Sequence, residues 1–209
     1  MYLPVHFREE RPEELRALIE RHPLAALVTA GKDGLTANHI PLLYDPSPAP
    51  LGTLEGHIAR GNPLWNDCQA GVDALAIFQG PEAYISPNWY PTRAQDGRVV
   101  PTWNYVVVHV WGRLTAYTEP ERLRLFLDRL TAVHEREEAV PWTPADAPTA
   151  YIDGLLQGIA GIEFAISRIE GKWKVSQNQP EENRLGAADA LKGEMSGLIR
   201  RAGYTSPGS

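Results

Sequence analysis

Residues 105–117, YVVVHVWGRLTAY, form the strongest strand pattern in the 209-residue sequence. β-Branched and aromatic residues fill this stretch, and they are enriched in strands because they pack well on a pleated surface. Similar but shorter stretches lie on both sides of it, most of them separated only by turns. The regular alternation of strands and helices that indicates a parallel sheet is missing. We therefore expect a mainly β protein with peripheral helices (α+β), built as an antiparallel barrel of the Greek-key type.

Seven further strands are expected, at 24–29, 35–44, 53–59, 74–78, 83–86, 159–169 and 173–176. Asp33-Gly34 predicts a tight turn between the first two of them. Residues 79–81 (QGP) and 170–171 (EG) predict turns within the later pairs, because glycine and proline commonly interrupt strands. Pro41 indicates a strand edge or a bulge, since proline has no N–H for the ladder.

The helices are expected at the periphery of this barrel. Residues 12–21 place Leu15, Leu18 and Ile19 on one face of a short helix. Thr118 with Glu121 three residues later is typical of a capping box that starts a longer helix. Shorter helical segments are expected after 62–63, at 144–157 and at 183–201, and a long loop at 87–98.

Length and composition indicate one barrel domain over residues 1–180, with a carboxyl-terminal helix over 181–209 packed on it. A chain of this size buries enough surface to fold without disulfides or structural metals. Cys68 is the single cysteine, which excludes an intrachain disulfide and fits a reducing compartment. The sequence has no run of about 18 apolar residues. We therefore expect a cytoplasmic protein without membrane contact.

Charge and motifs exclude several function classes. The formal net charge is −6, whereas direct nucleic-acid binding usually requires a basic face. The densest basic cluster is small and lies near Lys192, Arg200 and Arg201, so DNA binding stays open without support from the charge. The sequence contains no P-loop, no dinucleotide-binding glycine motif and no hydrolase serine motif. We assign no catalytic residue.

Four segments place polar side chains within or beside expected strands: ANHIPL (37–42), GHIARGNP (56–63), PTWNY (101–105) and KWKVSQN (172–178). A polar side chain in a strand needs a hydrogen-bond partner or solvent. Each segment alone has an ordinary structural explanation, but together they favour a polar ligand or a polar interface.

Two of these features have alternative interpretations. Arg60 lies between a strand and a helix start, where a guanidinium and helix N–H groups suit a phosphate. A plain strand-to-helix turn with a solvated Arg60 is the alternative. His39, His57 and His109 are a weaker candidate set for a metal, because strand histidines more often form hydrogen bonds with the backbone or water. No metal site is assigned.

The four segments, together with MYLPVHF (1–7) and GPEAYISP (80–87), resemble the PaiB family of FMN-binding negative transcriptional regulators. The resemblance covers residue 1 to about residue 184. It implies a split β-barrel, of the kind also used by pyridoxamine-phosphate oxidases and flavin reductases. In such folds two subunits pair, and one FMN lies in each of two clefts at their interface. The resemblance therefore implies FMN as the cofactor and a homodimer as the assembly.

The same resemblance assigns candidate cofactor-binding residues. Asn38 and His39 should border the flavin ring or its ribityl chain. Arg60 should hold the FMN phosphate with His57 as its neighbour. Three further candidates should line the isoalloxazine, partly through backbone groups: Thr102, Trp103 and Asn104. The last three should approach from the final strand: Lys174, Ser176 and Gln177. Which subunit of the dimer supplies each contact stays open.

Three functions follow from this assignment. The first is an FMN-binding regulator of the PaiB type, which exerts negative control of gene expression. The second is an FMN-dependent oxidoreductase of the pyridoxamine-phosphate-oxidase-like split-barrel class. The third is a binding or oligomerisation module without flavin. Whether the protein is an enzyme is left open at this stage.

Overall fold

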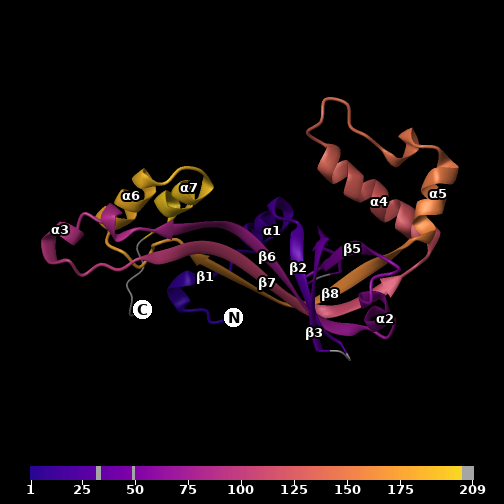
Figure 1. Cartoon of the computed structure of the whole chain (residues 1–209), viewed down its shortest axis with the longest axis horizontal. Coiled ribbons are helices and arrows are strands. Elements are labelled where there is room, and N and C mark those ends of the chain that lie inside the picture. Colours follow the sequence, from indigo (N-terminus) through magenta and orange to yellow (C-terminus); the bar gives the residue numbers. More distant parts are fainter. Residues whose placement is uncertain (32–33, 49, 204–209) are drawn as a thin grey trace. The chain divides into compact units, whose positions relative to one another are not determined.

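The structure is a computed structural model that describes residues 1–31, 34–48 and 50–203. Its strands form one sheet with the order β3-β2-β6-β7-β8-β5-β4, and β1 pairs with β8 (Figure 1). β1 pairs antiparallel with β8, β2 with β3 and β6, and β5 with β4 and β8. The expected antiparallel β-sheet with peripheral helices is therefore confirmed. The strands are β1 (Arg8–Glu9), β2 (Leu24–Gly31), β3 (Gly34–Pro41), β4 (Leu43–Asp45), β5 (Thr53–Ala59), β6 (Val72–Ile85), β7 (Thr102–Tyr117) and β8 (Ile159–Lys174).

The chain divides into two compact units. The first unit comprises residues 1–22, 78–109 and the chain from 170 onward, and the second comprises 23–77 and 110–169. Strands β6, β7 and β8 each continue from one unit into the other. We describe each unit by itself. The expected division at residue 180 stays a prediction.

The first hairpin follows the sequence closely. β2 and β3 pair from Leu24↔Pro41 to Gly31↔Gly34. The residues predicted to turn between them, Lys32 and Asp33, lie outside the described chain. Pro41 ends β3, the last strand in the sheet order. The missing N–H of this proline is therefore tolerated at an edge strand.

One continuous strand, β6, replaces the two strands expected at 74–78 and 83–86, so the predicted turn at 79–81 is wrong. Gly80 is required by close packing instead. A Cβ atom there would lie 2.6 Å from Leu18 Cδ1 and 2.7 Å from Val106 Cγ2. β2 pairs with β6 only over Ala74–Ile77. Pro81 therefore lies outside the stretch of β6 that pairs with β2, so its missing N–H costs no bond to that strand.

The last strand shows the same error. β8 runs without interruption through residues 170–171, which were expected to form a turn. Gly171 pairs with Glu9 of β1, and a Cβ atom on it would lie 2.3 Å from Leu15 Cδ2. Gly171 does not form a turn. Its missing side chain instead lets helix α1 approach β8 closely.

The described chain has more helices than the sequence predicts, and their bounds agree with the prediction only in part. α1 has the predicted bounds and buries Leu15, Leu18 and Ile19. Elsewhere the structure has α2 (Leu64–Gln69), α3 (Arg93–Asp96), α4 (Pro120–Glu135), α5 (Thr149–Gln157), α6 (Glu181–Ala190) and α7 (Glu194–Arg201), and the 3-10 turns η1 (Val5–Phe7), η2 (Pro87–Trp89) and η3 (Pro144–Asp146). No helix of the described part is long and apolar enough to cross a membrane.

Two predicted helix boundaries are wrong. The residue that caps α4 is Glu119 rather than Thr118, and no side-chain cap bond forms there. Pro120 occupies the first helical position, which suits its fixed φ and missing N–H. The single helix expected at 183–201 is two helices, because Gly193 adopts a φ of 84° just before α7 begins.

The segment 87–98, expected as a loop, carries η2 and α3. Within the first unit it is bonded to α6. Thr92 N and Thr92 Oγ1 lie 3.2 and 3.0 Å from Asn183 Oδ1, and Asn183 Nδ2 lies 2.8 Å from Thr92 Oγ1. A Cβ atom on Gly186 would lie 2.2 Å from Trp89 O, so α6 packs against this segment.

In the second unit α4 and α5 share a small apolar core. Tyr117, Leu123 and Leu156 are buried together, with Leu127 and Ile152 packed against them. This core joins the end of β7 to both helices, and it positions α4 beside the polar groups considered next.

Candidate functional site

Five of the ten predicted residues are joined by hydrogen bonds in the first unit, where β7 begins and β8 ends. Lys174 Nζ donates to Thr102 Oγ1 and, at 2.6 Å, to Trp103 O. These residues lie about 70 positions apart in sequence and meet because β7 and β8 are neighbours in the sheet. Burial lowers the pKa of Lys174, and the nearby charge of Lys172 lowers it further. The ammonium group of Lys174 therefore lies beside the backbone oxygen of Trp103.

Asn104 and Ser176 form the second pair, which is fully buried. Asn104 Nδ2 donates to Ser176 Oγ at 2.7 Å. Among the described residues no donor reaches Asn104 Oδ1, although the side chain is only 1% exposed. Ser176 has a φ of 64°, a left-handed backbone that non-glycine residues rarely adopt. An unsatisfied buried acceptor and a strained backbone thus lie side by side.

Gln177 has a different environment from the one expected. Its Oε1 accepts from Val175 N at 2.8 Å, and its Nε2 donates to Trp173 O at 2.5 Å. The side-chain amide therefore fixes the backbone just before the strained residue Ser176. This places Gln177 as a support of the site rather than as an open donor.

An exposed aromatic pair lies beside these groups. The rings of Tyr84 and Trp103 are 5.9 Å apart at 69°, an edge-to-face arrangement. They are 46% and 54% exposed, which is unusual for two large rings in contact. Trp103 was predicted from PTWNY, whereas Tyr84 was quoted within GPEAYISP without a role. Its period-two position in a strand was the signal that could have found it.

The other four predicted residues belong to the second unit, and among its described residues no hydrogen bond joins any two of them. Arg60 Nε donates to Ile159 O at 2.9 Å, so one edge of the guanidinium binds the main chain. Asn38 Oδ1 accepts from Asn62 Nδ2 at 2.8 Å, and Asn62 Oδ1 accepts from Leu64 N at 3.0 Å. The Asn62-Pro63 segment does begin a helix, α2.

Asn38 and Asn62 border a shallow pocket of about 270 Å³ between β3 and α2. Its lining is polar and small, with Gly31, Thr36 and Asp67 among the other residues. Arg60 and His57 are not part of this lining. The predicted contact of Arg60 with the FMN phosphate, with His57 as its neighbour, stays a prediction.

The histidines give no metal centre. His39 is exposed, and His57 is half-buried with its ring 6.0 Å from that of Phe126. Burial lowers the pKa of His57 and of His109. No group of three His, Cys, Asp or Glu side chains in the described chain is arranged to hold a metal ion. Cys68 is buried, and burial together with Asp67 raises its pKa to about 12.

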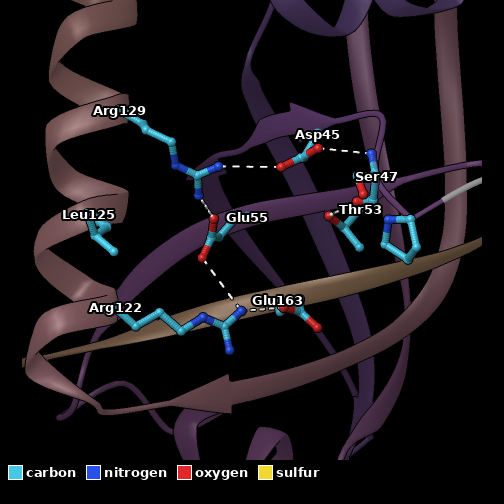
Figure 2. A pocket seen from close by; sticks show the side chains of 9 residues that line it. Asp45, Ser47, Thr53, Glu55, Arg122, Leu125, Arg129 and Glu163 are labelled. Carbon is cyan, nitrogen blue, oxygen red and sulfur yellow. Dashed lines mark hydrogen bonds and ion pairs between the residues drawn. The ribbon is translucent and has the colours of Figure 1, made fainter.

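A charged pocket of about 480 Å³ lies between α4 and strands β4, β5 and β8 of the second unit (Figure 2). Arg122 and Arg129 extend from α4 toward Glu55, and Leu125 lies between them on the same helix. Arg129 pairs with Glu55 and, at 3.4 Å, with Asp45. Arg122 pairs with Glu163 and lies 3.7 Å from Glu55.

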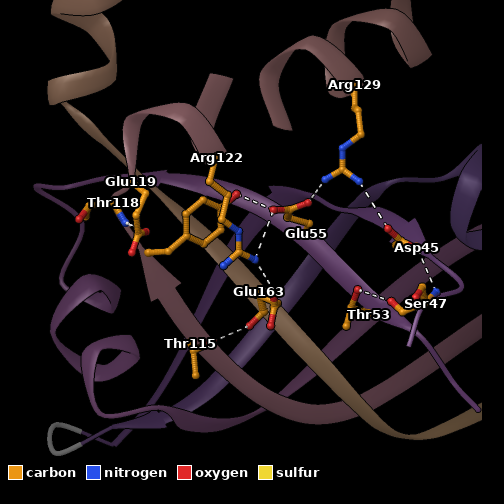
Figure 3. Close-up of polar contacts among 11 residues, drawn as sticks. Asp45, Ser47, Thr53, Glu55, Thr115, Thr118, Glu119, Arg122, Arg129 and Glu163 are labelled. Carbon is orange, nitrogen blue, oxygen red and sulfur yellow. Dashed lines mark hydrogen bonds and ion pairs between the residues drawn. The ribbon is translucent and has the colours of Figure 1, made fainter. Parts of the chain in front are cut away.

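Glu55 is the centre of this network (Figure 3). The residue is 8% exposed, and its Oε1 accepts from Tyr117 Oη at 2.5 Å. Burial raises the pKa of Tyr117, and the hydrogen bond to Glu55 raises it further. Arg122 also covers the Tyr117 ring at 3.7 Å. Because both guanidinium groups already bind carboxylates, the network acts as a clamp that fixes α4 on the sheet.

Sequence reasoning missed this clamp. The signal was present, since Arg122 and Arg129 are seven residues apart and therefore share a helix face. Glu55 was noted only as one of the residues on one face of its strand. Nothing in the local pattern connects that strand with the helix.

Solved structures share this fold. The FAD- and haem-binding protein of Mycobacterium smegmatis is similar with a TM-score of 0.57 at 16% identity, over 80% of this chain and 73% of that one. A conserved hypothetical protein of Mycobacterium tuberculosis is similar with a TM-score of 0.57 at 15% identity, over 93% and 99%. At such identities the likeness shows the fold alone, and it confirms the expected flavin-type split barrel.

Curated relatives are similar in sequence along nearly the whole chain. "Protease synthase and sporulation protein PAI 2" of Bacillus subtilis is 30% identical over 93% of this chain and 90% of its own length. An uncharacterised protein of Emericella nidulans is 32% identical over 92% and 90%. Residues 1–168 match the family described as "Putative FMN-binding domain". The chain therefore belongs to this FMN-binding-domain family, the PaiB family that its sequence segments resemble.

Proposed function

We propose that this protein binds FMN through the residues predicted from its sequence and works as a flavin-dependent regulator of gene expression. The observation that carries the proposal is Asn104, whose buried Oδ1 has no donor in the described chain. A buried polar atom is nearly always hydrogen-bonded in a folded protein. The edge of a flavin ring carries N–H donors, and a bound flavin would supply the missing bond.

The surroundings of Asn104 fit a flavin in two further respects. Trp103 and Tyr84 offer exposed aromatic surface against which a planar ring can pack. Lys174 supplies a positive charge near that surface, and a cation favours the reduced, anionic flavin. Bound FMN would supply reversible electron acceptance. Trp103, Asn104 and Lys174 would bind it and orient it.

In the second unit, Arg60 is the predicted phosphate ligand. Its Nε donates to Ile159 O, and no other hydrogen bond of its guanidinium is found among the described residues. The two terminal amino groups would then be available to the phosphate of FMN. Asn38, His39 and His57 would border the ribityl chain or the ring, as the family resemblance implies.

The regulatory role rests on the family rather than on a DNA-binding surface. We propose a homodimer with FMN at the subunit interface, whose flavin state is reported to transcription. The net charge of −6 gives little support for direct operator binding, so DNA affinity is expected to be weak and strongly dependent on salt.

A second candidate function is an FMN-dependent oxidoreductase. One observation favours it: Lys174 lies in the candidate site and has a lowered pKa, because it is partly buried beside Lys172. A lysine with a lowered pKa gives up its proton more readily than an ordinary one. Such a group would suit protonation of a reduced substrate.

Purified protein distinguishes these functions. Its visible absorbance is measured first, and reduced nicotinamide cofactor is then added in air. Flavin absorbance with slow turnover and salt-sensitive retention on promoter DNA supports the regulator. Flavin absorbance with rapid turnover supports the oxidoreductase. A colourless protein that binds no added FMN refutes both.

Arg60→Ala tests the phosphate contact. A hydrogen bond to a charged group contributes about 1.5–3 kcal/mol, so FMN should bind about 10- to 100-fold more weakly. Riboflavin lacks the phosphate, and its affinity should not change. Arg136→Ala is the matched control, since that arginine side chain is 70% exposed in the same unit. Equal losses for FMN and riboflavin would remove Arg60 from the site.

Sedimentation velocity tests the dimer. The FMN-loaded protein is expected to sediment as a dimer at micromolar concentration. A flavin-loaded monomer under these conditions would contradict a cofactor site that lies between subunits.

A further inference from the structure

Two of the four lysines in the sequence lie two residues apart on β8. Lys172 and Lys174 therefore project from the same face of the strand. They lie close enough that the charge of Lys172 lowers the pKa of Lys174. Lys172 was not among the residues predicted from the sequence, although it belongs to the same KWKVSQN segment.

Lys172 is buried to an extent that is rare for an ammonium group. The residue is only 8% exposed. Its Nζ donates to Tyr2 O at 3.0 Å and lies 5.6 Å and 5.2 Å from the ring centres of Tyr2 and Tyr105. Burying a charge is costly unless a partner of opposite charge compensates for it.

No such partner is present in the described chain. Neither Lys172 nor Lys174 forms an ion pair with a carboxylate among residues 1–31, 34–48 and 50–203. The acid nearest in sequence, Glu170, binds the amino group of Met1 at 3.1 Å. The two aromatic rings around Lys172 stabilise a cation but do not neutralise it.

The donor count points in the same direction. An ammonium group carries three N–H bonds. Lys174 uses two of them, for Thr102 Oγ1 and Trp103 O, and Lys172 uses one, for Tyr2 O. Three N–H bonds on the two lysines are left without an acceptor in the described residues. Lys174 is only partly buried, so a ligand can reach the pair from its side.

We propose that Lys172 and Lys174 form a binding site for an oxyanion, a phosphate or carboxylate group carried by a small molecule. Oxygen atoms of such a group accept the three remaining N–H bonds and neutralise the buried charge. Lys174 binds the main-chain oxygen of Trp103, whose exposed ring contacts that of Tyr84, so the molecule that carries the oxyanion is expected to be aromatic or otherwise planar.

The oxyanion has two sources with the same chemistry. It is either the phosphate of FMN itself or the acidic group of a separate substrate that binds next to the flavin. The first source deepens the proposed function and assigns the phosphate to the first unit instead of Arg60. The second source goes beyond the proposed function, because the two lysines would then bind an anion even without FMN.

Isothermal titration with inorganic phosphate, and separately with acetate, tests the site at constant ionic strength set by chloride. The wild-type protein is expected to bind at least one of these anions saturably. Lys172→Met and Lys174→Met should each weaken that binding at least about 10-fold. Lys192→Met, which removes an exposed lysine of the same unit, should leave it unchanged. Lys172→Arg retains the charge and should retain most of the binding, which separates a lost ligand contact from misfolding.

Titration with FMN and riboflavin identifies the source. A loss of FMN affinity without a loss of riboflavin affinity in Lys172→Met identifies the FMN phosphate. Unchanged flavin binding with lost phosphate or acetate binding identifies a separate substrate. If the wild-type protein binds no flavin, and Lys172→Met still weakens anion binding, the proposed function is refuted. The proposed oxyanion site is supported in that case. Absence of saturable anion binding in wild-type protein, together with unchanged FMN affinity in both lysine variants, would overturn the site.

Discussion

Replacing Tyr117 with phenylalanine removes one hydroxyl from the clamp beneath α4 and leaves the ring in place. The hydroxyl donates to Glu55 at 2.5 Å in a buried setting. A hydrogen bond to a charged acceptor contributes about 1.5–3 kcal/mol. Glu55 keeps its ion pair with Arg129, so we expect a loss near the lower end, about 2 kcal/mol. For a chain of this size that loss lowers the melting temperature by about 4–8 °C.

Thermal and urea unfolding of the variant measure this loss. Tyr151→Phe is the matched control, because Tyr151 belongs to the same unit, is 61% exposed and should be unaffected by losing its hydroxyl. A double-mutant cycle with Glu55→Gln then isolates the pair, and contacting residues couple by about 0.5–3 kcal/mol. If the two single losses simply add, or if Tyr117→Phe is as stable as Tyr151→Phe, the hydrogen bond does not stabilise the clamp.

The dependence of the Tyr117 contribution on pH has a definite sign. The folded protein raises the pKa of Tyr117, first through burial and then through Glu55. The unfolded tyrosine loses its proton near pH 10 while the folded one keeps it. The stability advantage of wild type over Tyr117→Phe should therefore be constant between pH 7 and about pH 10 and decrease at higher pH. An advantage that grows above pH 10 would contradict the raised pKa.

Two further outcomes follow from packing and burial. Gly112→Ala should destabilise the protein by about 3 kcal/mol or more, because its Cβ atom would lie 2.1 Å from the backbone oxygen of Ala165. In α5 the Cβ atom of Gly154→Ala would meet nothing within 4 Å, so this variant should instead gain about 1 kcal/mol in the free energy of unfolding. Urea unfolding that finds Gly112→Ala at least as stable as Gly154→Ala would contradict the close approach of Gly112 to Ala165. Cys68 should react with a thiol reagent at pH 8 at least about 100-fold more slowly in native than in unfolded protein, since its pKa is raised to about 12. Equal labelling rates would show that the thiol is accessible.

The sequence predicted strands well where the pattern was local and failed where glycine had a tertiary reason. β5 and α1 have their expected bounds, because alternation and helical spacing are properties of neighbouring residues. Gly80 and Gly171 were interpreted as turns, the most common local meaning of glycine. Each instead permits a close contact with Leu18 or Leu15 of α1, a partner about 60 or more residues away in sequence. Such contacts leave no trace in the local pattern.

The sequence predicted which residues belong to the candidate site, but not which of them contact one another. Thr102, Trp103 and Asn104 were assigned from the family resemblance of the segment PTWNY. That Lys174 binds the first two and Ser176 binds the third depends on β7 lying beside β8. The family match ends at residue 168, before Lys174 and Ser176. Their assignment therefore depends on the chemistry of this chain and on the wider resemblance.

Departures from ordinary protein structure concentrate in one part of the first unit. Ser176 has a strained backbone, and within the part of the chain that the structure describes Asn104 has a buried acceptor without a donor and Lys172 is a buried ammonium without a carboxylate. Each departure alone costs free energy, and natural sequences are otherwise locally consistent. Backbone strain persists where surrounding structure imposes it, and here the side-chain amide of Gln177 fixes the preceding residues. These three costs lie near the start of β7 and the end of β8, and they support the proposed ligand: an oxyanion would accept from the two lysines, and an N–H of a planar ring would donate to Asn104 Oδ1.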